Sequence, residues 1–146
     1  LRDIFYFKTK KKGTNLTEAI NFVMGMTKKR SVIFMISDFM DHSYEKSFKI
    51  LSKKHDVVPI VIEDPLEYEL PNAGTVAFQD QETDEVVYVN SSLDSVRKAY
   101  KNIHLSKRLE LDRLFKVSNC DFLRLNTHED YTQALIQFFR QRMGKS

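Results

Sequence analysis

Cysteine, histidine, proline and glycine are all scarce in this chain. The one cysteine, Cys120, cannot form a disulfide within the chain, so a disulfide-stapled secreted fold is excluded and a reducing compartment is expected. The four histidines lie apart and lack the paired spacing of a structural zinc site. With three prolines and four glycines, the sequence shows no low-complexity linker and no internal repeat.

Long apolar runs and a strong net charge are also missing. No stretch approaches the roughly 20 apolar residues that span a bilayer, and the first residues do not form a signal peptide with a cleavage site. Charged residues nearly balance, leaving a net charge of +3, so no overall field selects nucleic acid or an acidic partner. We therefore expect a cytoplasmic location.

The size and composition are those of one folded unit. A chain of 146 residues with 42% hydrophobic content can bury roughly two thirds of its unfolded surface. It opens at Leu1 with the apolar and aromatic segment LRDIFYF and without an initiator methionine. We expect residues 1–146 to be the C-terminal part of a single domain that continues upstream.

Apolar periodicity in the first half predicts alternating helices and strands. An amphipathic helix is expected to begin after Thr14 and Asn15, which can cap it. Residues 31–37 and 57–62 are short uninterrupted apolar runs, typical of parallel strands covered on both faces. A helix from about 44 to 54 separates them, which completes a strand–helix–strand unit.

The second half adds a hairpin, a helix, a strand and a helix. Pro59 cannot donate a ladder hydrogen bond, so its strand is expected to be locally at an edge or bulged. Residues 74–90 predict a β-hairpin around QETD, and 93–117 a long helix. A short strand at 121–126 precedes a closing helix that Thr127 can cap. The predicted class is a three-layer α/β/α fold with a mostly parallel sheet and an inserted hairpin.

Polar residues follow each predicted parallel strand. The carboxyl ends of such strands meet at one edge of a sheet, where ligands gather. Oxygen-bearing side chains there suit a divalent cation such as Mg²⁺, although a threonine beside a helix start is more often a cap and acids after strands often just begin exposed loops. The expected partner-binding rim comprises Asn15, Asp41, Glu63, Asp64 and His128, with Thr14 and Asp38 beside it.

GTNLTEAI followed by KRSVIFMISDF resembles the second half of von Willebrand factor A-like domains. A narrower resemblance is to a bacterial family of unknown function, whose members are often encoded beside MoxR-type AAA+ ATPases. It rests on the stretches YEKSFKILSKKHDVVPIVIEDPLEYELPNAG and DFLRLNTHEDYTQALIQFFRQR. The match spans nearly the whole chain. It implies a Rossmann-like interaction or assembly module, a MoxR-type ATPase as partner, and a parent protein anchored at the cytoplasmic face of the inner membrane.

The same resemblance implies that Thr14 and Asp38 occupy the threonine and aspartate places of a metal ion-dependent adhesion site. That site also needs an Asp-x-Ser-x-Ser motif, which nothing upstream of Thr14 supplies. Two oxygen ligands rarely hold Mg²⁺ without a third anchoring group. We therefore expect no metal in this chain, and Mg²⁺ only in the full-length protein if the motif precedes Leu1.

Two other functions compete with an interaction module. A magnesium-dependent phosphatase or hydrolase would use Asp38, with Asp41, Asp64 or His128 in support, but no lysine or serine motif completes a phosphoryl-transfer site. Nucleic-acid binding would use the aromatic and lysine-rich stretch 5–12, although a solvated loop beside a core-facing patch is the more usual structure. We favour a protein-binding role without catalysis and without a nucleic-acid partner.

The strand at residues 31–37 is expected to be exposed along one side if earlier strands of the sheet are missing. An uncovered strand presents a row of backbone donors and acceptors together with apolar side chains. We therefore expect the chain to self-associate through this strand or the flanking LRDIFYF segment, or to exchange elements between copies.

Overall fold

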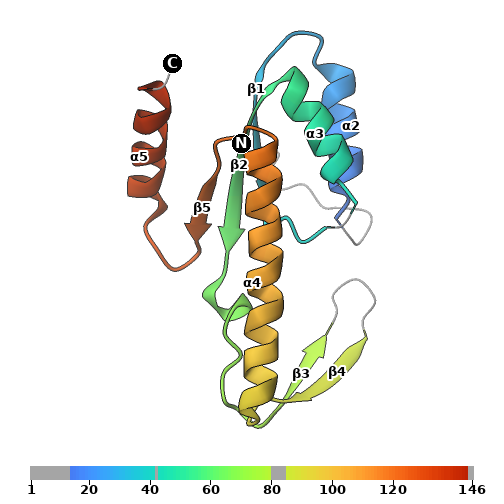
Figure 1. Cartoon of the computed structure of the whole chain (residues 1–146), viewed down its shortest axis with the longest axis vertical. Helices are drawn as coiled ribbons and strands as arrows, with labels where there is room; N and C mark the ends of the chain where they lie inside the picture. Colours follow the sequence, from blue (N-terminus) through green and yellow to red (C-terminus); the bar gives the residue numbers. More distant parts are fainter. Residues whose placement is uncertain (1–13, 42, 80–84, 145–146) are drawn as a thin grey trace, which may run out of the picture.

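A computed structural model describes residues 14–41, 43–79 and 85–144 (Figure 1). The LRDIFYF segment and the lysine-rich stretch after it lie outside these residues, as does His42. The elements in chain order are α2 (Leu16–Met26), β1 (Val32–Ser37), α3 (Glu45–Lys54), β2 (Asp56–Glu63), the 3₁₀ turn η1 (Pro65–Glu67), β3 (Thr75–Gln79), β4 (Val86–Asn90), α4 (Asp94–Val117), β5 (Leu123–Asn126) and α5 (Tyr131–Met143).

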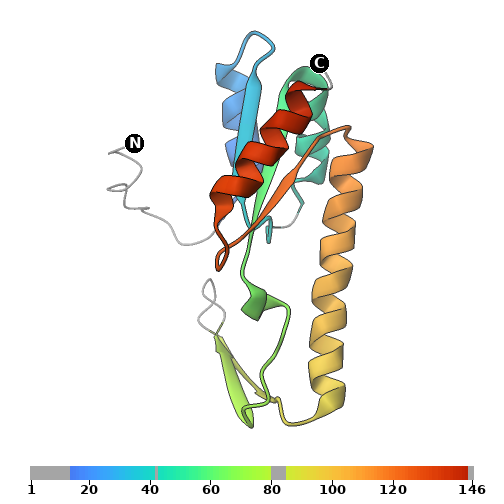
Figure 2. The same ribbon diagram turned by 90° about the vertical axis from the view of Figure 1, so that its left-hand side faces the viewer.

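The main sheet has the strand order β1-β2-β5, and both pairings are parallel. Helices α2, α3 and α4 cover one face and α5 covers the other, so the layers are helix, sheet and helix (Figures 1 and 2). Buried strands of this kind need apolar side chains on both faces, which is why their sequences show uninterrupted apolar runs. The predicted α/β fold with a mostly parallel sheet is confirmed.

Within the part of the chain that the structure describes, Pro59 lies where β2 pairs with a strand on one side only. It is in register with Met35 of β1, whereas pairing with β5 begins one residue later, at Ile60 and Leu123. A proline, which lacks the backbone N–H, is tolerated at such a position because β5 does not yet pair with β2 there and needs no hydrogen bond from it. Pro59 is fully buried, and it fits in this strand because pairing with β5 has not yet begun there, not because the strand is bulged or exposed to solvent.

The larger core lies between the sheet and α2, α3 and α4. Side chains of successive strand residues alternate between faces, so Val57 and Val61 point into this core. Phe48 of α3 and Phe115 of α4 meet there with ring centroids 5.3 Å apart, and both are fully buried. Val58, also fully buried, lies on the α5 face by the same alternation.

Strands β3 and β4 form the antiparallel hairpin predicted at 74–90, with Thr75 opposite Asn90. Its base is closed by the fully buried Ser91, whose hydroxyl donates to the Gly74 carbonyl at 2.8 Å. Helix α4 has 24 residues and is about 36 Å long at 1.5 Å per residue. It runs from the hairpin to the sheet, with Tyr100 against Phe78 at 5.7 Å (Figure 1).

Helix α5 begins later than its sequence suggests. Its N-cap is Asp130, whose carboxylate accepts from the Thr132 amide at 2.8 Å. The prediction that Thr127 caps this helix is wrong, because a turn intervenes in which the Glu129 amide donates to the Asn126 carbonyl at 3.2 Å. Asparagine and aspartate both favour local turns. The segment therefore offers two candidate N-caps for α5, Thr127 and Asp130, only three residues apart.

Candidate functional site

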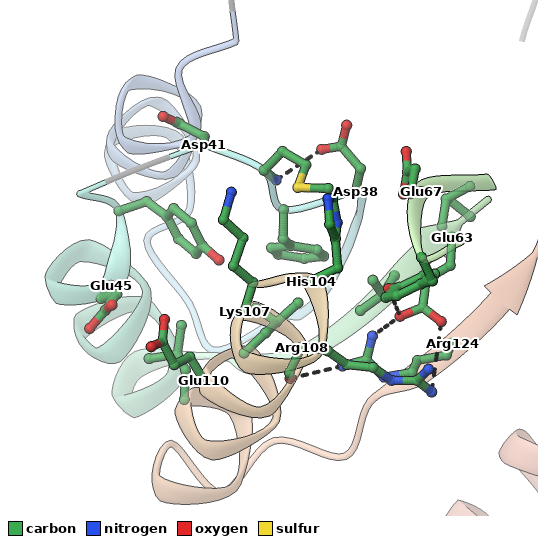
Figure 3. A pocket seen from close by; sticks show the side chains of 18 of the residues that line it. Asp38, Asp41, Glu45, Glu63, Glu67, His104, Lys107, Arg108, Glu110 and Arg124 are labelled. Atoms are coloured by element: carbon green, nitrogen blue, oxygen red, sulfur yellow. Dashed lines mark hydrogen bonds and ion pairs between the residues drawn. The ribbon is translucent and has the colours of Figure 1, made fainter. Parts of the chain in front are cut away.

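The parallel strands place their following residues at one edge of the sheet, as predicted. A cavity of about 190 Å³ lies there between the ends of β1 and β2 and helix α4 (Figure 3). We call it the strand-end cleft. Its lining comprises Asp38–Asp41, Ser43–Glu45, Val61–Glu63, Glu67, Tyr68, His104, Lys107, Arg108, Glu110, Leu111, Leu114 and Arg124. Of the rim residues expected from sequence, Asp38, Asp41 and Glu63 line the cleft, whereas Thr14, Asn15, Asp64 and His128 do not.

The loop between β1 and α3 is held in an unusual backbone conformation. Phe39 and Ser43 have φ values of 57° and 71°, a left-handed region that disfavours residues with a Cβ. The Phe39 amide donates to the Ser37 hydroxyl at 3.0 Å, and the Met40 amide donates to Asp38 Oδ1 at 3.1 Å. Strained backbone of this kind persists only where its surroundings fix it, and it is concentrated at functional sites.

The buried ring of Phe39 anchors this loop. It is 6% exposed and lies 5.2 Å from Phe115 and 6.0 Å from Tyr44 between ring centroids. Burial of this ring offsets the unfavourable backbone and fixes the position of Asp38 at the mouth of the cleft. Burial also raises the pKa of the Tyr44 hydroxyl, with nearby carboxylates as lesser causes, so this tyrosine is neutral at physiological pH.

Replacing Ser43 with glycine is expected to stabilise the fold by roughly 0.5–1 kcal/mol. Relief of the left-handed strain, about 1–2 kcal/mol, exceeds the added entropy of the unfolded glycine chain, about 0.5–1 kcal/mol. Urea unfolding measures the change. The matched control is Asn119→Gly, also at positive φ (54°), where the gain should be smaller because asparagine tolerates this region. Destabilisation by Ser43→Gly would contradict the strain argument.

Asn15 and Asp41 both serve the N-terminus of α2. Asn15 is the N-cap, and its side chain accepts from the Glu18 amide at 2.9 Å. Asp41 Oδ2 accepts from the Leu16 amide at 2.5 Å. A carboxylate at this position satisfies an amide that the helix leaves unpaired and complements the helix dipole. The capping role expected for Asn15 is therefore present, and Asp41 ties the strained loop to α2.

The described residues do not assemble a metal site by themselves. Within residues 14–41, 43–79 and 85–144, no group of three or more His, Cys, Asp or Glu side chains is placed to hold a metal ion. Asp38 Oδ1 is engaged by the Met40 amide and lies 3.3 Å from the Ser37 hydroxyl. Thr14 and Asp38 alone do not meet the oxygen-ligand requirement of Mg²⁺, and binding by the full-length protein stays a prediction.

Glu63 is the centre of a partly buried ion network on one wall of the cleft. Its carboxylate contacts the Arg124 guanidinium and accepts from the Tyr68 hydroxyl at 2.8 Å, with Arg108 at 3.8 Å. Arg124 also pairs with Asp112 of α4. Side-chain exposure is 12% for Glu63 and 15% for Arg124, so both ends of this ion pair are largely shielded from water. The pairs of Arg124 with Glu63 and Asp112 join β2, β5 and α4. The Glu63 carboxylate is therefore engaged within the chain.

Burial and neighbouring charges shift the pKa values of several cleft residues. Burial and the hydrogen bond to Glu63 raise the pKa of Tyr68 to about 12. Burial raises the pKa of Glu67. Burial, and secondarily the charge of Lys107, lower the pKa of His104. His104 is therefore neutral at pH 7, and Lys107 and the arginines supply the positive charge of the cleft.

The residues that helix α4 contributes were not anticipated from sequence. His104 stacks against Tyr100 at 4.4 Å and approaches Tyr68 at 6.1 Å, while the Arg108 guanidinium lies 5.6 Å from the Tyr68 ring. Figure 3 shows Lys107 reaching over the cleft from the same helix. The signal available was the spacing of positions 100, 104, 107 and 111, which places them on one helical face.

Other residues considered from sequence lie outside the cleft. Cys120 is half-buried, and burial, with Asp56 as a lesser cause, raises its pKa to about 11. It is therefore a protonated thiol at neutral pH, as expected for a packed cysteine and not for a nucleophile. The His128 amide donates to the Asn126 side chain at 2.9 Å within the turn before α5. None of the described helices is long and apolar enough to cross a membrane.

The chain resembles several bacterial proteins whose functions have not been determined. It is 25% identical over 130 residues to "Uncharacterized protein MAV169" of Mycobacterium avium, covering 88% of this chain and 76% of that protein. It is 26% identical over 129 residues to "Uncharacterized protein Rv1480" of Mycobacterium tuberculosis and "Uncharacterized protein Mb1516" of Mycobacterium bovis, covering 88% of this chain but 40% of each relative. No solved structure matches significantly.

The model of one protein family matches most of the sequence. This family is described as "Protein of unknown function DUF58", and the match extends over residues 1–110. The matched region includes β1, β2, the hairpin and α4 as far as Glu110, and therefore His104, Lys107 and Arg108 of the cleft but not Leu111 and Leu114. The chain therefore belongs to the DUF58 family.

Proposed function

We propose that this chain is a protein-interaction module of the von Willebrand factor A-like type and that a protein partner binds at the strand-end cleft. The observation that carries the proposal is a small, firmly held hollow at the edge of the sheet where such domains carry their adhesion site. The strained β1–α3 loop forms one wall and the Glu63–Arg124 network the other. Walls fixed in this way keep a contact surface preorganised, which lowers the cost of binding.

The size of the cleft favours an anchor from a protein over a small-molecule ligand. Its volume is about 190 Å³, below the roughly 300–1,000 Å³ of typical small-molecule and cofactor sites. A hollow of this size holds one large side chain. Protein interfaces often depend on a few such anchors, each inserted in a pocket near the centre of the contact.

The chemistry of the cleft is that of an interface. Its floor is apolar, with Val61 at 2%, Leu114 at 6% and Phe39 at 6% exposure. Its mouth carries exposed charges of both signs, from Asp38 and from Lys107. An apolar centre inside a charged rim is the usual arrangement where two proteins meet, because rim charges select the partner while the centre excludes water.

The partner we propose is a MoxR-type AAA+ ATPase, because members of this family are often encoded beside one. The contact proposed here needs no metal ion. Binding by the full-length protein in the presence and absence of EDTA tests whether Mg²⁺ contributes through Thr14 and Asp38. A dependence on Mg²⁺ that disappears in Asp38→Ala would support the metal-assisted form of the interaction.

Replacing Lys107 with glutamate is expected to weaken binding of the purified MoxR-type ATPase at least tenfold, or about 1.4 kcal/mol. Lys107 reaches over the cleft (Figure 3), so reversing its charge disrupts complementarity at the contact itself. Titration calorimetry measures the affinity. The control is Lys53→Glu in the last turn of α3, the same change at the opposite end of the sheet, which should leave affinity within about threefold.

Equal losses from the Lys107 and Lys53 variants would contradict the cleft as the contact surface. Absence of binding by the unaltered chain would contradict the proposed partner. The competing hydrolase function has its own test, which is hydrolysis of p-nitrophenyl phosphate with Mg²⁺. Turnover that disappears in Asp38→Ala would favour the enzyme, whereas the interaction module predicts no turnover to lose.

A further inference from the structure

The strand-end cleft carries more negative than positive charge. Among the described residues, the cations that line it are Lys107, Arg108 and Arg124, whereas the carboxylates are those of Asp38, Asp41, Glu45, Glu63, Glu67 and Glu110. Both arginines are engaged with Glu63, so they do not offset the other carboxylates. Lys107 is then the one remaining cation beside five carboxylates of this described lining.

Asp38 and Glu67 form the part of the wall that lacks a positive partner. Figure 3 shows both side chains at the same end of the cleft. Neither forms an ion pair with any residue that the structure describes. Burial is the first cause of the raised pKa of Glu67, and the charges of Asp38 and Glu63 act in the same direction. A cation that enters the cleft from outside would stabilise the charged form of these carboxylates.

The hydroxyl of Tyr44 is a second and independent sign that the cleft takes a ligand. Tyr44 is 5% exposed and lines the cleft. Its hydroxyl forms no hydrogen bond within the described part of the chain, and it is not one of the fully enclosed unpaired atoms there, so it opens onto the cleft. Tyrosine hydroxyls in buried residues usually have a hydrogen-bond partner. A donor group placed in the cleft would supply one.

The occupant that matches these groups is a cation with several N–H donors. An acidic group would be repelled by the excess of carboxylates, and an apolar group would leave Asp38 and Glu67 desolvated without a partner. Within the described residues, no three carboxylates are placed to hold one metal ion. A guanidinium has five N–H donors in one plane and can reach separate acceptors at once. Its apolar stem can lie along Phe39 and Leu114 of the floor.

We infer that the anchor inserted in the strand-end cleft is an arginine side chain of the partner protein, held by Asp38, Glu67 and the Tyr44 hydroxyl. The inference rests on the proposed function for the presence of a protein partner. The preference of the cleft for a guanidinium can be measured without that partner. Lys107 at the mouth is left to contact an acidic group of the partner beside the anchor.

NMR titration of the ¹⁵N-labelled chain with N-acetyl-arginine amide, in the presence of EDTA, tests this preference. The probe is expected to shift the amide signals of residues 38–41 and 43–45. Its affinity should exceed those of N-acetyl-glutamate amide and N-acetyl-leucine amide by about tenfold or more, because charge-assisted hydrogen bonds form with the arginine probe alone. The lysine probe should bind more weakly, since its ammonium is a compact point charge. Equal affinity for any of these probes, or no shift with the arginine probe, overturns the inference.

Three variants identify the groups that hold the probe. Asp38→Asn and Glu67→Gln should each raise its dissociation constant at least about threefold, and Tyr44→Phe about threefold, in line with the loss of one hydrogen bond. Asparagine keeps an acceptor for the Met40 amide, and phenylalanine keeps the ring that packs on Phe39.

The matched control is Glu129→Gln, at an exposed position outside the cleft, which should bind the probe unchanged. Urea unfolding should show no loss of stability in Glu67→Gln, because this change removes a half-buried charge. Unchanged affinity in all three cleft variants, or an equal loss in the control, overturns the inference.

Competition separates this inference from the proposed partner. A saturating excess of the arginine probe should raise the apparent dissociation constant of the MoxR-type ATPase, because both occupy the cleft, and Glu67→Gln should weaken ATPase binding. An ATPase that binds without competition from the probe overturns the arginine anchor and leaves the proposed function standing. A chain that binds the probe through these residues but not the ATPase supports the inference for the cleft and shows that the proposed partner is wrong.

Discussion

Replacing Phe115 with alanine is expected to lower the free energy of unfolding by about 4 kcal/mol, within the 3–5 kcal/mol typical of buried phenylalanine. Phe115 is fully buried and occupies the centre of the larger core. Its ring centroid lies 5.1–5.3 Å from those of Phe39, Phe48 and Phe122. The substitution removes packing from three rings at once and leaves a cavity that the surrounding helices and sheet can only partly close.

Urea unfolding monitored by circular dichroism measures this loss, and Phe115→Leu should lose less because it keeps part of the buried volume. The control is Ile103→Ala, on the same helix but 56% exposed, for which a change within about 0.5 kcal/mol is expected. Because Phe115 supports Phe39 and thereby the strained loop, Phe115→Ala should also weaken partner binding under conditions where it remains folded. Similar losses from Phe115→Ala and Ile103→Ala would contradict the central position of Phe115.

Replacing Arg124 with methionine is expected to destabilise the fold by about 3 kcal/mol, the lower end of the range for breaking a buried ion pair. The lower end applies because the two partners keep 12% and 15% exposure. The variant leaves the Glu63 carboxylate desolvated, with Arg108 at 3.8 Å and the Tyr68 hydroxyl as its remaining contacts. It also removes the cation that pairs with Asp112.

A double-variant comparison separates this charge effect from lost packing. Glu63→Gln/Arg124→Met removes the unpaired carboxylate together with the guanidinium, so it should be less destabilised than the sum of the two single variants. Arg113→Met, at an exposed position on α4, is the matched control and should change stability by less than about 0.5 kcal/mol. Strict additivity of the two single variants would show that Glu63 and Arg124 do not act as a pair.

Much of the fold could be predicted because local patterns specify it. Two uninterrupted apolar runs indicated β1 and β2, and alternation around QETD indicated the hairpin. The start of α5 was misplaced because the sequence offers two capping candidates, Thr127 and Asp130, and only the intervening turn selects between them. Helix boundaries depend on a few side-chain hydrogen bonds, which are less evident in sequence than the period of a buried face.

The candidate site was predictable only in part. Strand direction placed Asp38 and Glu63 at the same edge, because all three strands of the main sheet are parallel. The engagement of Asp41 with the start of α2 was not foreseen, since it joins residues 25 positions apart. The strain at Phe39 was also invisible, because a bulky residue gives no sequence signal of positive φ.

The sequence by itself determined the order and type of the elements, and through them the edge of the sheet where polar groups gather, because apolar periodicity follows directly from burial. Only the tertiary structure decided that α4 crosses this edge and brings His104 and Lys107 into the cleft. It also decided that Glu63 pairs with Arg124, which lies 61 residues away. The physical reason is that long-range pairings depend on how helices and strands pack together, and residue spacing along the chain does not record that arrangement.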